Sequence, residues 1–136
     1  MTTNILNPFR ILIADDDTDD VEILSEAFTQ SGVENVHYVH SAMQAFNYLQ
    51  QVEKKENLPK LVVTDLYLPG ISGAEFLADL KNMERYKNIP VIVLSTIKSE
   101  REIEKYKQMG VKEYLRKPTT YDEYIEVARF MKEQIA

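Results

Sequence analysis

The sequence has no cysteine among its 136 residues. Disulfides, thiolate catalysis and zinc sites built on cysteine are therefore excluded, and the chain suits a reducing cytosol. Long apolar runs are also missing. The longest ones are far shorter than the run that a membrane-spanning helix needs. Met1 to Pro8 lacks the basic region and the apolar core of a signal peptide. We therefore expect a soluble, cytoplasmic protein.

An excess of positive charge is missing as well. The chain has 22 acidic and 16 basic residues, which gives a net charge of -6. A protein with this balance lacks the basic footprint that binding to nucleic acid or to anionic lipid requires. We expect no nucleic acid and no membrane among its partners, whereas cations and basic protein surfaces suit its charge.

Short apolar runs alternate with segments of helical period along the whole chain. The length suits one domain, and the alternation predicts an α/β fold in which helices cover both faces of a parallel sheet. Five strands are predicted, at Phe9 to Ala14, Val36 to Val39, Leu61 to Thr64, Val91 to Leu94 and Glu113 to Leu115. Amphipathic helices are predicted after each of them, the fourth with the thinnest apolar stripe.

Local signals set the expected ends of these helices. Ser41, Ser72 and Ser99 have the position and chemistry of N-caps, and Gly32 and Gly110 stand where helices should stop. The charged segment from residue 50 to residue 60 is predicted to be an extended connection within the domain.

Polar side chains collect directly after the predicted strands. In an open parallel sheet, ligands bind beyond the carboxyl ends of the strands, so carboxylates, a hydroxyl and an amine should meet at one edge. The residues concerned are Asp15, Asp16, Asp65, Ser95, Thr96 and Lys117.

Four spaced motifs make the sequence similar to the receiver domains of two-component response regulators, from about Phe9 to Gln134. ILIADDD carries the acidic pair, VVTDLYLPGISG carries Asp65 at the usual offsets from a proline and a glycine, VIVLST carries the hydroxyl and EYLRKP carries the lysine. Four motifs in order are a strong signal. The resemblance implies a flavodoxin-like, doubly wound, five-stranded parallel sheet of order 2-1-3-4-5 with five helices.

The resemblance also implies roles for single residues. Asp65 would be the phosphoacceptor, since a carboxylate can attack phosphorus to give an acyl phosphate. Magnesium (or manganese) would lie between the anions, because it prefers oxygen ligands. Asp16 and Asp65 would be direct ligands, Asp15 would act through a water molecule, and the backbone carbonyl of Tyr67 would complete the set. Lys117 and Ser95 would bind phosphoryl oxygens, Thr96 is adjacent to the switch hydroxyl, and Tyr114 would be the aromatic switch residue.

Plainer interpretations apply to part of the acidic stretch. Asp17, Asp19 and Asp20 are interpreted as the start of a helix, where a cap and negative charge are favourable. Asp15, Asp17, Asp19 and Glu26 also match positions of an EF-hand calcium loop, but the required glycine is replaced by Asp20 and a strand pattern enters the loop.

Two further alternatives remain. A phosphatase of the haloacid dehalogenase type would need an aspartate two residues after the nucleophile, where this chain has Tyr67. We therefore expect a phosphoacceptor that catalyses its own phosphorylation and dephosphorylation, and not an enzyme that turns over an external substrate. The other alternative is a receiver-like scaffold that acts without phosphorylation.

Partners follow from the expected organisation, a single receiver domain over residues 1–136 with no output domain, since only 19 residues follow Lys117. The phosphoryl donor would be a sensor histidine kinase or a phosphotransfer protein, and the downstream protein target is unknown. The long connection at residues 50–60 resembles the single-domain regulators paired with phytochrome-type kinases. Tyrosines and basic residues in the last third suit a protein interface, including a homodimer through the last two helices and the fifth strand. They are Tyr106, Tyr114, Tyr121 and Tyr124 with Lys98, Arg101, Lys105, Lys112 and Arg116.

Overall fold

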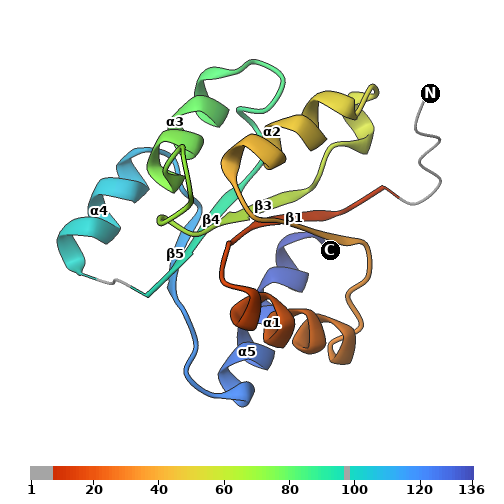
Figure 1. The fold of residues 1–136 in the computed structure, drawn as a ribbon, viewed down its shortest axis with the longest axis vertical. Helices are drawn as coiled ribbons and strands as arrows, with labels where there is room; N and C mark the ends of the chain where they lie inside the picture. Colours follow the sequence, from red (N-terminus) through yellow and green to blue (C-terminus); the bar gives the residue numbers. More distant parts are fainter. Residues whose placement is uncertain (1–7, 97–98) are drawn as a thin grey trace.

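Five parallel strands form the centre of the protein, in the order β2-β1-β3-β4-β5 (Figure 1). The computed structural model describes residues 8–96 and 99–136. The strands are β1 (Ile11–Ala14), β2 (Val36–Val39), β3 (Leu61–Thr64), β4 (Val91–Ser95) and β5 (Glu113–Arg116). Every neighbouring pair runs parallel. The predicted strand order is therefore confirmed.

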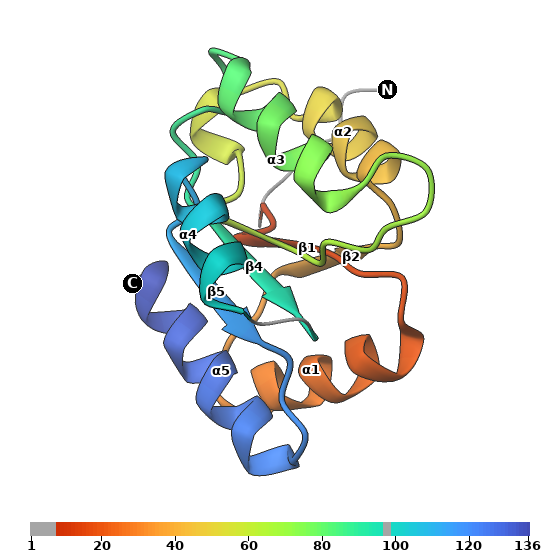
Figure 2. The same ribbon diagram turned by 90° about the vertical axis from the view of Figure 1, so that its left-hand side faces the viewer.

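Five helices cover the two faces of the sheet. They are α1 (Thr18–Gln30), α2 (Ala42–Gln51), α3 (Gly73–Asn82), α4 (Glu100–Gln108) and α5 (Tyr121–Gln134). Helices α1 and α5 lie on one face, and α2, α3 and α4 lie on the other (Figures 1 and 2). Strands β1, β3 and β4 are buried along their whole length, as expected for strands with both faces covered.

Each face of the sheet has its own apolar core. Alternate residues of a strand point to opposite faces, so Ile11 and Ile13 pack with α1 and α5, whereas Leu12 and Ala14 pack with α2 and α3. The apolar stripes predicted for the helices supply the other half of each core. The sequence pattern therefore fixes which face of each helix meets the sheet.

The expected helix boundaries are largely confirmed. The side chains of Ser41, Ser72 and Ser99 accept hydrogen bonds from backbone N–H groups three residues ahead. Gly32 and Gly110, just after α1 and α4, have φ angles of +79° and +96°, which a residue without a Cβ adopts at little cost. The glycines thus end the helices as predicted.

Several predicted boundaries differ from the structure, and β4 and β5 each end one residue later than predicted, at Ser95 and Arg116. Strand β1 begins at Ile11 and not at Phe9, whose ring instead stacks on His37 at a centroid distance of 4.6 Å. The connection at residues 50–60 is also not fully extended, because α2 continues to Gln51 and a 3-10 turn, η1, spans Lys55–Asn57. Leu58 is buried directly after that turn, which gives the polar segment an apolar anchor.

Candidate functional site

Three of the predicted site residues extend the hydrogen-bond ladder of the sheet by one residue. The N–H of Asp15 donates to Val39 at 3.0 Å, the N–H of Asp65 donates to Ala14 at 3.0 Å, and the N–H of Lys117 donates to Ser95 at 2.8 Å, each bond ending on a backbone carbonyl. All three residues therefore sit at the carboxyl edge of the sheet, with their backbones fixed to neighbouring strands.

The side chains of these residues meet at the ammonium of Lys117. Its Nζ atom lies 2.7 Å from Oδ2 of Asp65 and 3.1 Å from Oδ2 of Asp15. Asp15, Asp65 and Lys117 are 5%, 7% and 8% exposed. Ionised groups that are this well buried are stable only when they are paired, so the three residues depend on one another.

The remaining oxygens of the two aspartates bind backbone N–H groups. Oδ1 of Asp15 accepts from the N–H of Asp17 at 2.9 Å, and Oδ1 of Asp65 accepts from the N–H of Tyr67 at 3.2 Å. Each carboxylate is thus held through both of its oxygens: Oδ1 binds a backbone amide and Oδ2 binds the ammonium. This arrangement orients both carboxylates toward Lys117.

Gly73 allows the chain to pack tightly behind Asp65. A Cβ atom at this glycine would lie 2.0 Å from the carbonyl oxygen of Asp65 and 2.7 Å from Cα of Leu66. Both neighbours are backbone atoms, which cannot move without moving the turn after β3. A glycine is therefore needed where α3 begins, and it fixes the position of Asp65.

The buried charged groups at the site shift the pKa values of one another. Burial raises the pKa of the Asp15 carboxyl above its usual value, although the N–H of Asp17 and the charge of Lys117 oppose the rise. Burial alone would lower the pKa of Lys117, but its hydrogen bonds with Asp20 and Asp65 and the charge of Asp15 outweigh this effect and raise it. Lys117 therefore stays charged at neutral pH.

Ser95 closes the site at the end of β4. Its side chain is fully buried, and its hydroxyl has no hydrogen-bond partner of normal geometry among residues 8–96 and 99–136. The neighbouring Thr96 is exposed. A buried hydroxyl without a partner is costly, so Ser95 is a donor available to a group that enters the site.

Tyr114, on β5, is buried and reaches α4. Its hydroxyl donates to Oε2 of Glu102 at 3.3 Å, and its ring lies 5.9 Å from that of Tyr106. Burial and the charge of Glu102 raise the pKa of Tyr114 to about 12, while the nearby Ser95 hydroxyl opposes the rise. The tyrosine thus lies between the site hydroxyl and α4.

The predicted metal ligands Asp16 and Tyr67 are exposed at the site, Tyr67 by 55%. Within the described part of the chain, no three acidic or histidine side chains are already arranged as a metal site. The carboxylates converge on Lys117, and three of them against one ammonium leave an excess of two negative charges. Oxygen donors with this excess suit a hard divalent cation, so the residues present fit the expected metal.

Asp20 is a site residue that the sequence interpretation missed. Asp17 caps α1, as expected, and Asp19 and Asp20 lie in the first turn. The interpretation of Asp20 as only a helix start was nevertheless incomplete, because its Oδ2 atom lies 2.8 Å from Nζ of Lys117. The one signal in the sequence is periodicity: Asp20 stands four residues before the buried Leu24, on the same face of α1.

The calcium-loop alternative does not agree with the structure. Strand β1 enters the acidic stretch, and α1 begins at Thr18, so Asp19 and Glu26 both lie within a helix. Asp17 uses its Oδ1 atom to accept from the N–H groups of Asp19 and Asp20. An EF-hand needs a 12-residue loop between two helices, and this segment has neither the loop nor the first helix.

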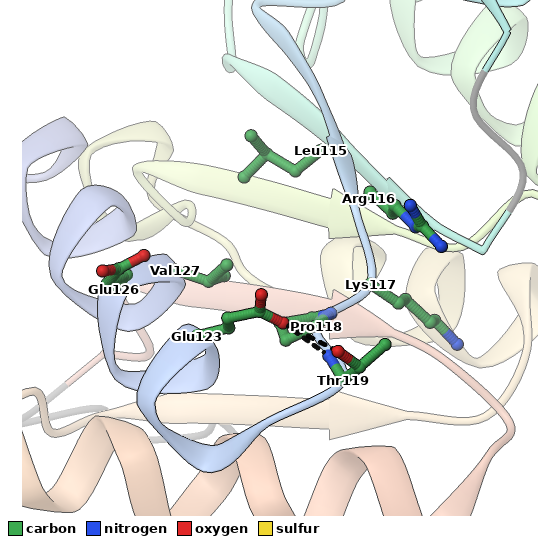
Figure 3. Close-up of a pocket in the computed structure, with 8 residues that line it drawn as sticks. All are labelled: Leu115, Arg116, Lys117, Pro118, Thr119, Glu123, Glu126 and Val127. Carbon is green, nitrogen blue, oxygen red and sulfur yellow. Dashed lines mark hydrogen bonds between the residues drawn. The ribbon is translucent and has the colours of Figure 1, made fainter.

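A pocket lies between the end of β5 and α5, apart from the acidic edge (Figure 3). Glu123, Glu126 and Val127 line it from α5, and Glu123 accepts hydrogen bonds from Thr119. The side chain of Lys117 leads away from Glu126 and Val127 in this view. Lys117 is therefore the one residue that the pocket shares with the carboxylate cluster.

The tyrosines of the last third differ in exposure. Tyr106, Tyr114 and Tyr124 are buried, and Tyr121 is 40% exposed. The basic residues Arg101, Lys105, Lys112 and Arg116 are all exposed, whereas Lys98 lies outside the described residues. Of the residues named for this interface, Tyr121 and these four basic residues are therefore accessible, whereas the other three tyrosines are not.

A doubly wound parallel sheet that gathers an acidic pair, a strand-end aspartate and a lysine at its carboxyl edge defines a receiver-type signalling domain. The chain belongs to the response regulator receiver domain family, whose sequence model matches residues 11–129. It is thus a receiver domain of two-component signalling.

Similar proteins support this assignment. The probable methanogenesis regulatory protein FilR2 of Methanothrix harundinacea is 30% identical over 129 residues, which cover 93% of this chain and 83% of that protein. The structure of the phosphorylated cyanobacterial phytochrome response regulator RcpA has a TM-score of 0.80 at 30% identity and covers 94% of both chains. The Mn²⁺-bound form of response regulator Rcp1 has a TM-score of 0.78 at 28% identity over 93% of both chains.

A separate finding concerns membranes. Among residues 8–96 and 99–136, no helix combines the length and the apolar character that crossing a bilayer requires.

Proposed function

We propose that this chain is a phosphorylation-controlled receiver that accepts a phosphoryl group on Asp65. The donor would be a phosphohistidine of a sensor histidine kinase or of a phosphotransfer protein. The observation that carries the proposal is the buried ammonium of Lys117, which lies 2.7 Å from Asp65 and 3.1 Å from Asp15. A cation held against a strand-end carboxylate is suited to bind the phosphoryl oxygens that this carboxylate would receive.

In the proposed step, a carboxylate oxygen of Asp65 attacks phosphorus and forms an acyl phosphate. The bond between phosphorus and the donor nitrogen breaks, and the departing imidazole keeps the electron pair and takes up a proton. Lys117 transfers a hydrogen bond from the carboxylate to a phosphoryl oxygen, and the buried hydroxyl of Ser95 donates to another. Positioning and charge neutralisation dominate such transfers, and both residues contribute to them.

A divalent cation is part of the proposal. Asp15, Asp16, Asp65 and the backbone carbonyl of Tyr67 would hold Mg²⁺ or Mn²⁺, and the ion would neutralise the charge between the carboxylates and the phosphoryl group. The excess negative charge around Lys117 supports this assignment. So does the likeness to Rcp1, whose structure is described as Mn²⁺-bound.

The output is proposed to be a changed protein surface. Movement of Ser95 toward a phosphoryl group would alter the space beside Tyr114, which is linked to Glu102 on α4. Helix α4, strand β5 and helix α5 would then present a different face to a downstream protein or to a second copy of the chain. The likeness to the phytochrome response regulator RcpA makes a phytochrome-type kinase a suitable donor to test. No turnover of an external substrate is proposed.

The test is incubation with acetyl phosphate and Mg²⁺, followed by intact-mass measurement. The wild type should gain one phosphoryl group, and Asp65→Asn should gain none. Asp79→Asn, which removes an exposed carboxylate from α3, is the matched control and should behave as the wild type. A wild type that never forms the adduct with acetyl phosphate or phosphohistidine donors would favour the scaffold that acts without phosphorylation.

A further inference from the structure

Asp20 binds the lysine of the site from outside the set of proposed ligands. Its Oδ2 atom lies 2.8 Å from Nζ of Lys117, and its side chain is 25% exposed, compared with 7% for Lys117. The two residues are 97 positions apart in the sequence. This contact therefore arises from the packing of α1 beside the end of β5.

The three N–H groups of the ammonium are matched by three carboxylates. An ammonium has three donors and no acceptor, and Asp15, Asp20 and Asp65 all lie within 3.1 Å of Nζ. In the proposed function, Asp15 and Asp65 are shared with the metal ion, and Asp65 also receives the phosphoryl group. Asp20 has neither task, so its bond to Lys117 is the one that can persist through the reaction.

Asp20 is itself held by α5. Its Oδ1 atom accepts a hydrogen bond from the hydroxyl of Tyr124 at 3.1 Å. Tyr124 is 5% exposed, and α1 and α5 lie side by side on the same face of the sheet (Figures 1 and 2). One oxygen of Asp20 thus binds Lys117, while the other is fixed by a buried tyrosine.

We propose that Asp20 is a positioning residue that anchors Lys117 while the lysine moves one hydrogen bond from Asp65 to a phosphoryl oxygen. The inference rests on the proposed phosphorylation of Asp65. Without the anchor, the flexible stem of the lysine would have to be ordered when the phosphoryl group binds, and this ordering costs side-chain entropy. Tyr124 contributes by holding the anchor in place.

Electrostatic repulsion by Asp20 would have the opposite effect on the binding of a phosphoryl group. Asp20 adds a negative charge close to the site, and like charges repel an incoming phosphoryl donor. If repulsion dominated, removing the charge of Asp20 would strengthen binding of phosphoryl analogues. If anchoring dominates, removing it weakens their binding.

The first measurement compares Asp20→Asn with Asp19→Asn by calorimetry. Asp19 is an exposed neighbour in the same turn, so its substitution removes the same charge without touching Lys117. Relative to this control, Asp20→Asn should bind beryllofluoride with Mg²⁺ roughly tenfold more weakly, as expected for one charge-assisted hydrogen bond. Affinity for Mg²⁺ alone should agree between the two variants within about twofold, because Lys117 is not a metal ligand.

Tyr124→Phe should weaken beryllofluoride binding in the same direction, but less than Asp20→Asn does. Equal or tighter binding of beryllofluoride by Asp20→Asn than by Asp19→Asn would overturn the inference. So would a parallel loss of affinity for Mg²⁺ alone, since that result would mean that the site as a whole has been damaged.

The second measurement observes the lysine directly and needs no phosphoryl group. In a ¹⁵N–¹H spectrum of lysine ammonium groups, the Lys117 signal, assigned by its absence in Lys117→Arg, should be visible in the wild type and in Asp19→Asn. It should broaden or disappear in Asp20→Asn, because a loosely held ammonium exchanges its protons faster with water. An unchanged signal in Asp20→Asn would overturn the anchoring.

The two measurements separate the inference from the proposed function. A wild type that shows the Asp20-dependent ammonium signal but forms no adduct on Asp65 would overturn the phosphoacceptor function and the role in the reaction. A wild type that forms the adduct while Asp20→Asn matches its control in both measurements would overturn the role of Asp20 alone.

Discussion

Lys117 and Asp65 lie 52 positions apart in the chain, and the ammonium of the lysine donates a 2.7 Å hydrogen bond to the carboxylate. They directly follow β3 and β5, which are separated in the sheet by β4. The residue that follows each strand is thus brought to the same place by the parallel topology. The chemistry proposed for this protein depends on that pairing.

The stability of the protein should depend on Lys117. Lys117→Met leaves the buried carboxylates of Asp15 and Asp65 without their cation, and the free energy of unfolding at pH 7 should fall by about 3 kcal/mol. Urea denaturation measures this change. The exposed Lys112→Met should stay within about 0.5 kcal/mol of the wild type. Equal stability of the two variants would contradict the importance of the buried ion pairs.

The pH dependence of this effect has a defined sign. The pKa of Lys117 is raised in the folded state, so its contribution to stability is fully present below the ordinary lysine pKa and is lost as the pH rises through the higher folded value. The difference between wild type and Lys117→Met should therefore persist through neutral pH. It should shrink in acid, where the carboxylates become protonated.

Asp15 should destabilise the folded protein at neutral pH when no metal is bound. Its pKa is raised by burial, so its favourable contribution is present only below the unfolded pKa and is lost as the pH rises through the folded value. Asp15→Asn should therefore flatten the loss of stability that begins as the pH rises above the ordinary aspartate pKa of about 4. Urea denaturation across this range tests the sign, and an unchanged pH profile would contradict it.

Asp15→Asn should help the metal-free protein, as above, but it should weaken the binding of Mg²⁺. Added Mg²⁺ should raise the unfolding temperature of the wild type, because a ligand that binds only the folded state stabilises it. Asp15→Asn should lose most of this increase, with a roughly tenfold or larger loss of Mg²⁺ affinity. Asp79→Asn is the control, and an equal response to Mg²⁺ in both variants would argue against Asp15 as part of the metal site.

Ser95→Ala should stabilise the unphosphorylated protein. Its hydroxyl is buried without a partner of normal geometry among the described residues, so its removal should raise the free energy of unfolding by about 1 kcal/mol. Thr64→Val is the contrasting variant, because the Thr64 hydroxyl donates to the carbonyl oxygen of Asp65 at 2.8 Å. That variant should lose about 1 kcal/mol. Chemical denaturation of both variants measures these changes. A lower free energy of unfolding in Ser95→Ala would contradict the prediction.

Gly73→Ala should disturb the turn that carries Asp65. The new Cβ atom would lie 2.0 Å from a backbone oxygen, and relief of this overlap should cost about 3 kcal/mol of stability. Gly70→Ala separates crowding from backbone strain, since Gly70 has a φ angle of +76° and open space around it. Its cost should be about 1 kcal/mol. Thermal unfolding of both variants gives the comparison, and equal losses would contradict the steric explanation.

Most of the fold was predictable from local patterns. The apolar runs identified the central strands because both faces of a parallel sheet are buried, and Ser41, Ser72 and Ser99 marked helix starts through a hydrogen bond that lies within a few residues. The start of β1 was less predictable, because Phe9 is apolar but packs on His37 and Tyr48 instead of continuing the strand. Apolar character alone does not distinguish these two environments.

The site was predictable only where its residues follow strands. Asp15, Asp65 and Lys117 stand at strand ends, and a parallel sheet brings these ends together. Asp20 could not be placed in the same way, because its contact with Lys117 depends on how α1 packs beside α5. The exposures of Tyr106, Tyr114 and Tyr124 also depend on tertiary packing, and composition alone made them resemble members of a protein interface.

The ladder bonds made by the N–H groups of Asp15, Asp65 and Lys117 have a consequence for hydrogen exchange. These amides directly extend β1, β3 and β5 and bond to carbonyl groups of neighbouring strands, so their hydrogens should exchange only when the sheet itself opens. The site should therefore have no partly unfolded form of its own. As long as the sheet survives, the backbone positions of its three central residues survive with it, and only their side chains and the surrounding helices remain free to respond.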